Sequence, residues 1–259
     1  MAKLMGVVNV TPDSFSDGGL YLDPEAAIAH GEELLAAGAD VLDVGGESTR
    51  PGAEPVAAAE ELRRVLPVIE GLAGATISVD TSKASVAAAA LDAGATIVND
   101  VTALRGDPEM AALVAEREAT VILMHMRGEP RTMQEDPAYG DVVAAVKEFL
   151  AARIEDALAA GIAAERTWVD PGIGFGKTAE HNIELLRRLG ELRELGRPLV
   201  IGTSRKSFIG RLDGSAARER LGGTIASTVF AAAAGADVLR IHDVAEIRQA
   251  LTLADAVLG

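Results

Sequence analysis

The sequence predicts an α/β fold, a single-domain (β/α)8 barrel of the TIM type that spans residues 1–259. Short runs rich in β-branched and aliphatic residues alternate eight times with amphipathic segments rich in Ala, Leu and Glu. The runs are continuously apolar, as is typical of parallel strands that are covered on both faces. A chain of 259 residues suits one undivided barrel. A doubly wound open sheet is the alternative arrangement of the same units.

Each strand and helix is expected where a local pattern marks it. The strands lie near residues 4–10, 41–44, 76–79, 96–98, 120–124, 167–169, 199–201 and 238–241. Between them, residues 24–37, 56–72, 141–160 and 218–234 carry apolar side chains at helical spacing. Three helix-to-strand junctions, at residues 37–41, 93–97 and 234–238, are near copies with Gly at the second position. A glycine there suits the left-handed residue that follows a helix end.

The amino-acid composition limits the partners and the chemistry that we expect for this chain. The chain has 24 Lys and Arg against 39 Asp and Glu, a net charge of −15, which repels nucleic acid and anionic membranes. It has no Cys, which excludes disulfides, thiolate metal ligands and a cysteine nucleophile. It shows neither a signal-peptide pattern nor an apolar stretch of about 18 residues. We therefore expect a cytoplasmic protein without nucleic-acid or membrane partners, in which an anionic substrate needs local cations, a metal or helix N-termini.

Residues 170–178, Asp-Pro-Gly-Ile-Gly-Phe-Gly-Lys-Thr, resemble two phosphate-binding loops and match neither. A Walker loop requires glycine where Pro171 stands, and proline has no N–H to offer a phosphate. The dinucleotide fingerprint requires a third glycine where Lys177 stands. The stretch therefore predicts a buried strand that delivers Asp170 to a glycine loop.

Polar residues stand at or just after the C-terminal end of every expected strand. They are Asn9, Asp43, Asp80, Asn99, His125, Asp170, Ser204, Lys206, Arg240 and His242. In a barrel these positions line one mouth, the face on which active sites lie. A single Asp or Asn there can merely cap the next helix, but Lys and Arg cannot cap a helix N-terminus. The set therefore predicts a pocket at the C-terminal mouth of the strands.

These residues lie in motifs that resemble dihydropteroate synthases from about residue 5 to the C-terminus. The motifs occupy residues 5–19, 43–52, 78–81, 98–100, 123–128, 170–177, 204–207 and 240–243. The resemblance implies a transferase of folate biosynthesis and a target of sulfonamides. Its reaction would join 6-hydroxymethyl-7,8-dihydropterin diphosphate to p-aminobenzoate, giving 7,8-dihydropteroate and diphosphate. It also implies Mg2+ as cofactor and a homodimer as the assembly.

The resemblance also assigns roles to individual residues. Asp80, Asn99, Asp170 and Lys206 would hold the pterin, Thr49, Arg50, Arg240 and His242 the diphosphate, and Asn9 the Mg2+. Among these, Asp80, Lys206, Arg240 and His242 are the expected catalytic residues. A carboxylate such as Asp170 suits the guanidine-like edge of a pterin, because it accepts two parallel N–H bonds. Bond cleavage leaves a cation on the ring and an anion on diphosphate, so anions are expected near the ring and cations near the leaving group.

The acceptor side of the site is expected around Phe175 and Ser207. A planar p-aminobenzoate ring suits Phe175, although this phenylalanine could equally be a packed anchor of its loop. A helix N-terminus that Ser207 opens would attract the carboxylate. Residues 11–21 and 50–52 are polar, Gly- and Pro-containing loops that we interpret as lids. His125 is expected beside Met124 at the pocket floor, and His30 on a solvent-facing helix position.

Two other functions fit parts of the pattern. A pterin-binding methyltransferase domain would use the pterin edge without diphosphate, and residues 204–206 and 240–242 disfavour it because they supply cations. A non-catalytic paralogue would bind pterin or a partner protein, yet every polar position expected of a working site is present. Diphosphate release that requires both p-aminobenzoate and Mg2+ distinguishes the three hypotheses.

Overall fold

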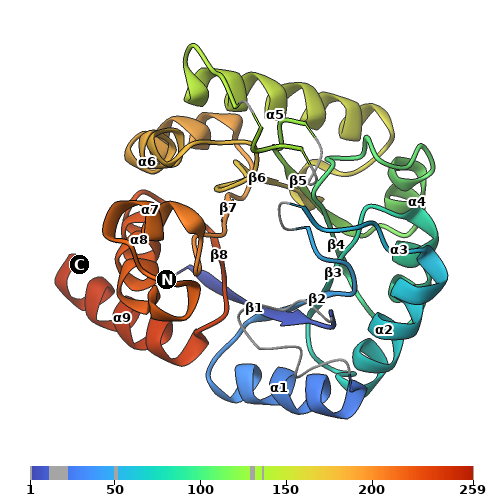
Figure 1. Cartoon of the computed structure of the whole chain (residues 1–259). Helices are drawn as coiled ribbons and strands as arrows, with labels where there is room; N and C mark the ends of the chain where they lie inside the picture. Colours follow the sequence, from blue (N-terminus) through green and yellow to red (C-terminus); the bar gives the residue numbers. More distant parts are fainter. Residues whose placement is uncertain (1, 12–22, 50–51, 129–131, 136, 259) are drawn as a thin grey trace.

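Parallel strands curl into a barrel that helices surround (Figure 1). The computed structural model describes residues 2–258 except 12–22, 50–51, 129–131 and 136. Its strands are β1 (Lys3–Asn9), β2 (Val41–Gly45), β3 (Ile77–Asp80), β4 (Ile97–Asp100), β5 (Thr120–Met124), β6 (Thr167–Asp170), β7 (Val200–Ile201) and β8 (Val238–Ile241). They are hydrogen-bonded in the order β6-β5-β4-β3-β2-β1-β8-β7. A parallel bridge between Val169 and Leu199 joins β6 to β7 and closes the ring, which confirms the barrel and excludes the open sheet.

The helices follow the strands in alternation. They are α1 (Pro24–Ala36), α2 (Ala58–Gly71), α3 (Ala84–Asp92), α4 (Met110–Glu116), α5 (Val142–Ala159), α6 (Ala179–Arg187), α7 (Ser207–Asp213), α8 (Leu221–Ala233) and α9 (Val244–Leu258). Short 3-10 turns stand at η1 (Ala164–Arg166), η2 (Leu189–Leu195) and η3 (Ala217–Glu219). No helix in the described part of the chain is both long and apolar enough to cross a membrane.

Local signals explain where several helices begin and end. The side chains of Asp23 and Asp141 accept hydrogen bonds from the first backbone N–H groups of α1 and α5. Gly38, Gly94 and Gly235 have φ values of 101°, 112° and 93°, the left-handed conformation expected at the three repeated junctions. The prediction that His30 faces solvent is wrong, because its side chain is only 17% exposed.

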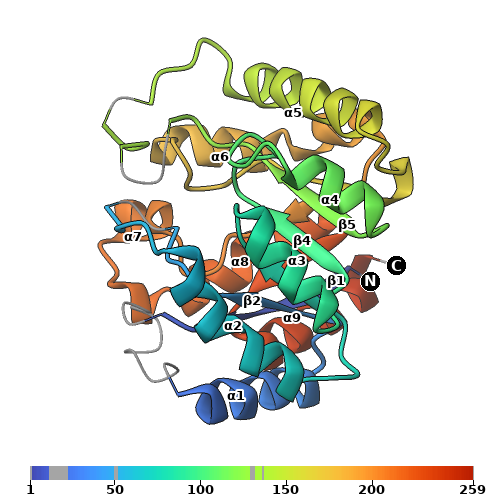
Figure 2. The same cartoon turned by 90° about the vertical axis from the view of Figure 1, so that its right-hand side faces the viewer.

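The barrel interior changes from apolar to polar along its axis. Near the strand N-termini it is filled by Met5, Val41, Ile97, Ile122, Val200 and Val238, with the partly buried Trp168. Since side chains alternate along a strand, the next inward positions on β2, β4 and β8 are Asp43, Asn99 and Arg240. Both termini lie at the apolar end, whereas α7 lies at the opposite, polar end (Figure 2). The fold therefore places the polar residues at the mouth formed by the strand C-termini.

Candidate active site

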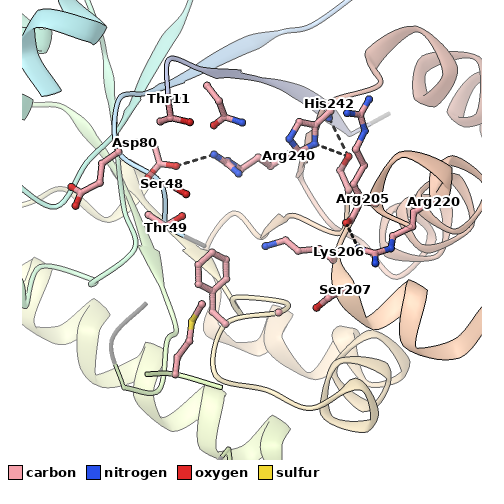
Figure 3. A pocket seen from close by; sticks show the side chains of 17 residues that line it. Thr11, Ser48, Thr49, Asp80, Arg205, Lys206, Ser207, Arg220, Arg240 and His242 are labelled. Carbon is pink, nitrogen blue, oxygen red and sulfur yellow. Dashed lines mark hydrogen bonds and ion pairs between the residues drawn. The ribbon is translucent and has the colours of Figure 1, made fainter. Parts of the chain in front are cut away.

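A cavity of about 380 Å³ opens at the C-terminal mouth of the barrel (Figure 3). Predicted residues in its lining are Asn9, Thr49, Asp80, Phe175, Lys206, Ser207, Arg240 and His242. A smaller hollow continues it towards the barrel axis and adds Asn99 and Asp170. All described residues to which the sequence assigned a binding, metal-ligating or catalytic role thus meet at one place. Arg50, and the greater part of the two expected lids, lie outside the described residues.

Arg240 is the centre of a buried ionic network in the floor. Its Nε donates to Asp43 Oδ2 at 2.6 Å. Its Nη2 donates to Asp80 Oδ2 at 2.8 Å, as Figure 3 shows. Asn99 Nδ2 donates to the same oxygen of Asp43 at 3.1 Å. Burial raises the pKa of Asp80 to about 7, although Arg240 acts in the opposite direction. Burial by itself lowers the pKa of Arg240, but Asp43 and Asp80 together raise it above its ordinary value.

The floor also contains acceptor oxygens that the described residues leave without partners. These buried atoms are Asp43 Oδ1, Asp80 Oδ1 and Ser78 Oγ. Asp80 lines both the cavity and the hollow beneath it. Buried acceptors without partners are rare in native proteins and suggest groups that a ligand satisfies. The floor is therefore suited to a ligand that presents N–H donors.

Asp170 reaches the hollow from the end of β6. It is 6% exposed, and its Oδ1 accepts a 2.7 Å bond from the backbone N–H of Gly172. Burial raises the pKa of Asp170, while the Gly172 N–H, Lys206 and Arg240 act to lower it. A carboxylate oxygen has two lone pairs, so this internal bond leaves Asp170 able to accept further N–H groups.

The loop after β6 does not present its lysine to a ligand. Lys177 is 3% exposed, and its ammonium bonds to His125 and to backbone carbonyls of the loop itself. Burial, assisted by Lys206, lowers the pKa of Lys177 to about 7. Burial and the neighbouring Lys177 lower the pKa of His125 to about 3. This geometry agrees with the interpretation that residues 170–178 are no phosphate loop.

His125 differs from its predicted position. Its ring packs edge-on against Phe149 of α5, with the centroids 4.9 Å apart, and it lines neither the cavity nor the hollow. The prediction that it forms the pocket floor is therefore wrong. The β-strand alternation explains this: Met124 points inward, so the next residue points towards the surrounding helices.

Basic groups gather on the side of the cavity formed after β7 and β8. Lys206 extends into the cavity, and its Nζ lies 4.2 Å from the centroid of the Phe175 ring (Figure 3). His242 Nδ1 and Ser204 Oγ are 2.9 Å apart. Arg220, which the sequence did not suggest, also lines this side, and its Nη1 donates to the Arg205 carbonyl at 3.1 Å. No motif marks Arg220, because it stands in the connection before α8.

Ser207 stands one residue later than expected relative to its helix. Lys206 occupies the N-cap position of α7 in extended conformation, and Ser207 is the first helical residue. Its side chain therefore does not cap the helix, although the exposed Ser207 still lines the cavity. The chain turns sharply just before this point, where Arg205 has a φ of 56°.

The loop that carries Thr49 is anchored by a buried charge cluster. Lys83 Nζ bonds to Glu47 and also to Glu61 Oε2, the latter at 2.5 Å. Glu61 is fully buried in α2, and Glu47 Oε1 accepts from the Val56 N–H at 3.1 Å. Glu47 also lines the cavity, a position that sequence reasoning missed although it lies within the motif at 43–52. The cluster attaches the β2 loop to the body of the barrel.

Comparison with known proteins identifies the family. A family model described as "Pterin binding enzyme" matches residues 5–242. A dihydropteroate synthase of Synechocystis is 47% identical over 258 residues, which cover 98% of this chain and 89% of that protein. The chain belongs to the dihydropteroate synthase family.

Solved dihydropteroate synthase structures agree in fold. That of Yersinia pestis with a sulfonamide drug has a TM-score of 0.97 at 44% identity and covers 99% of this chain and 94% of that one. That of Xanthomonas albilineans with 4-aminobenzoic acid has a TM-score of 0.93 at 50% identity, covering 100% and 93%. As a member of this family, the chain is a transferase that condenses 6-hydroxymethyl-7,8-dihydropterin diphosphate with p-aminobenzoate to 7,8-dihydropteroate.

Proposed function

We propose that the dihydropteroate synthase reaction takes place in the cavity at the strand C-termini, with the pterin in the hollow beneath it. The observation that supports this most is the convergence of Asp80, Asn99, Asp170 and Lys206 on that hollow. Asp170 and the unpartnered Asp80 Oδ1 would accept N–H groups from the pterin edge. Asn99, whose amide nitrogen already donates to Asp43, would offer its oxygen.

Charge separation in the site suits cleavage of the methylene–oxygen bond. The buried carboxylates of Asp80 and Asp170 line the hollow where positive charge would develop on the ring, and that of Asp43 is bonded to Arg240 beside it. Arg240 and His242 lie at its outer edge, where the diphosphate would leave. Groups fixed in advance at these places stabilise developing charge without reorganising, which is the main electrostatic source of catalysis. Thr49 and Arg50 are proposed as further diphosphate ligands.

Mg2+ is the proposed cofactor, with Asn9 as its protein ligand. Asn9 lines the cavity beside Thr11, and the described residues contain no group of three or more His, Cys, Asp or Glu that could hold a metal. A single amide oxygen fits a hard cation that is bound mostly through diphosphate and water. When bound, Mg2+ would neutralise charge on the departing diphosphate.

The arylamine is proposed to bind between Phe175, Lys206 and Ser207. The X. albilineans relative was solved with 4-aminobenzoic acid and the Y. pestis relative with a sulfonamide drug, and we propose that this chain binds both classes at the same place. Phe175 would stack on the aryl ring, and the ammonium of Lys206 would attract the carboxylate of p-aminobenzoate. The amine would then face the pterin methylene group across the cavity.

A homodimer is the proposed assembly, formed by one-domain subunits in the cytoplasm. Leu212 of α7, Phe230 of α8, and Leu253 and Val257 of α9 are each 65–74% exposed. These helices lie together on one flank of the barrel (Figure 1). Apolar side chains gathered in this way are typical of a subunit interface. Sedimentation should detect a dimer that Phe230→Glu dissociates, and a monomeric parent protein would contradict the proposal.

The decisive experiment measures diphosphate release by the full chain. Release should require the pterin diphosphate, p-aminobenzoate and Mg2+ together, and Asp170→Asn should serve as the inactive matched control. Release without p-aminobenzoate would indicate a hydrolase-like activity. Pterin binding with no release under any condition would favour the methyltransferase domain or the non-catalytic paralogue.

A further inference from the structure

The ammonium of Lys177 is fully used inside the glycine loop. It lies 2.9 Å from His125 Nδ1, 2.9 Å from the Gly172 carbonyl, 2.9 Å from the Phe175 carbonyl and 3.3 Å from the His125 carbonyl. An ammonium group has three protons and no acceptor, so these four atoms saturate it. At 3% exposure, Lys177 has no surface with which to touch a substrate.

The loop lies directly on the segment after β5. Gly172 and Gly176 have φ values of 65° and 62°, and a Cβ at these positions would lie 2.0 Å from the His125 carbonyl oxygen and 2.6 Å from that of Arg127. Only glycine tolerates both the conformation and the close approach. Two side chains add further bonds: Gln134 donates to the Gly174 carbonyl at 2.7 Å, and Tyr139 donates to the Gly176 carbonyl at 2.8 Å.

Phe175 is a residue of this loop whose side chain lines the cavity. Phe175 packs against the cluster of Val101, Met124, Met126 and Met133, and it faces the cavity beside Lys206. Both backbone polar groups of Phe175 are hydrogen-bonded: its N–H donates to the Gly172 carbonyl, and its carbonyl accepts from the Lys177 ammonium. Lys177 therefore fixes the backbone from which the Phe175 ring projects, although Lys177 does not itself line the cavity.

We propose that Lys177 is a positioning residue for the arylamine half of the site: it acts through Phe175 and touches neither substrate. This inference rests on the proposed function, specifically on the place of p-aminobenzoate against Phe175. A residue that orients a binding surface used equally in the ground and transition states changes KM more than kcat. The pterin side should be less affected, since Asp170 belongs to β6 and its internal bond comes from the Gly172 N–H, whereas Lys177 bonds to the Gly172 carbonyl.

The test compares Lys177→Met with the parent enzyme in the full chain. We expect the KM for p-aminobenzoate to rise about tenfold with kcat within about threefold, the pattern of lost uniform binding. Affinity for a pterin analogue, measured by calorimetry without turnover, should change by less than about threefold, the size expected of a contact that is not lost. Lys147→Met, which removes a half-exposed lysine of α5 that pairs with Glu194, is the matched control and should leave all three values unchanged.

A double-mutant cycle separates positioning from general loosening of the fold. If Lys177 acts through Phe175, adding Lys177→Met to Phe175→Ala should raise the KM for p-aminobenzoate no further. Additive effects, an unchanged KM in the single variant, or equal losses for both substrates would each overturn the inference. Inactivity of the parent enzyme would instead refute the proposed function itself.

Two milder variants keep the inference testable if Lys177→Met does not fold. Tyr139→Phe and Gln134→Leu each remove one bond to the same loop and keep the charge of Lys177. Both should raise the KM for p-aminobenzoate by a few fold with little change in kcat, the pattern expected when uniform binding weakens. Unchanged KM values in both variants would count against control of the aryl pocket by this loop.

Discussion

Replacement of Arg240 by methionine should destabilise the protein as well as inactivate it. A residue at a barrel mouth ordinarily contributes little to the core, so its place at the end of the last strand alone would predict a loss of turnover far larger than the loss of stability. Its contacts lead us to expect a sizeable stability effect as well, because Arg240 is bonded to Asp43 and Asp80, both buried. Methionine keeps most of the apolar stem and removes the guanidinium.

The expected magnitude follows from the burial of the two carboxylates. Removal of one partner from a buried ion pair costs about 3–5 kcal/mol, since the remaining charge stays desolvated. Because the parent pKa of Asp80 is already raised to about 7, this carboxyl can take up a proton and limit the cost to the lower part of that range. For a domain of this size, about 3 kcal/mol corresponds to roughly 6–12 °C in Tm.

Urea unfolding at pH 8 and pH 5 measures this effect. Arg240 acts to lower the pKa of Asp80, so in the variant this folded-state pKa stays raised above the unfolded value, and stability is retained at low pH and lost as pH rises. The difference from the parent should therefore be larger at pH 8. Arg63→Met is the control, because Arg63 is 71% exposed and its pair with Glu60 is worth little. A variant within about 1 kcal/mol of the parent at pH 8 would refute this account.

Three further predictions concern single sites. Asp170→Asn should weaken binding of a pterin analogue about 100-fold, because an amide offers one acceptor and one unwanted donor, and calorimetry that shows equal affinity would exclude Asp170 from the site. Because the pKa of His125 falls from 6.5 to about 3 on folding, stability is full above pH 6.5 and declines below it, by ~2 kcal/mol at pH 5. His125→Asn should remove that decline in urea titrations, and a persistent decline would assign it to other groups. p-Aminobenzoate should bind about 5–150-fold more tightly when Mg2+ and diphosphate are present, and equal affinities in paired titrations would indicate a preformed pocket.

The barrel could be predicted because its signals are local. Each strand is a continuous apolar run, and Gly38, Gly94 and Gly235 mark helix ends through their own backbone preference. The observed strand ends differ from the predicted ones by a residue or two, where hydrogen bonding rather than hydrophobicity sets the limit. The position of the site followed from the same pattern, since the C-terminal ends of parallel strands meet at one mouth.

Side-chain partners within the site could not be predicted, because they depend on contacts between distant segments. Arg240 and Asp43 are separated by 197 positions, and no local pattern says that a cation from the last strand reaches a carboxylate from the second. The sequence around Lys177 excluded both kinds of phosphate-binding loop. It did not indicate that the ammonium would donate to backbone carbonyls of its own loop. His125 was misplaced because a one-residue step along a strand exchanges inside for outside.

The position of Arg240 reconciles the acidity of the chain with an anionic substrate. A net charge of −15 would repel diphosphate from a uniformly acidic mouth. Instead, Asp43, Asp80 and Asp170 are buried in the floor, and Arg240 is bonded to the first two of them and also lines the cavity. In the proposed reaction, carboxylates would then face the place where the pterin ring becomes positive, and basic groups would face the place where diphosphate departs. Under this proposal, Arg240 would serve both the stability of the floor and the separation of charge in the reaction, so we expect its replacement to affect both.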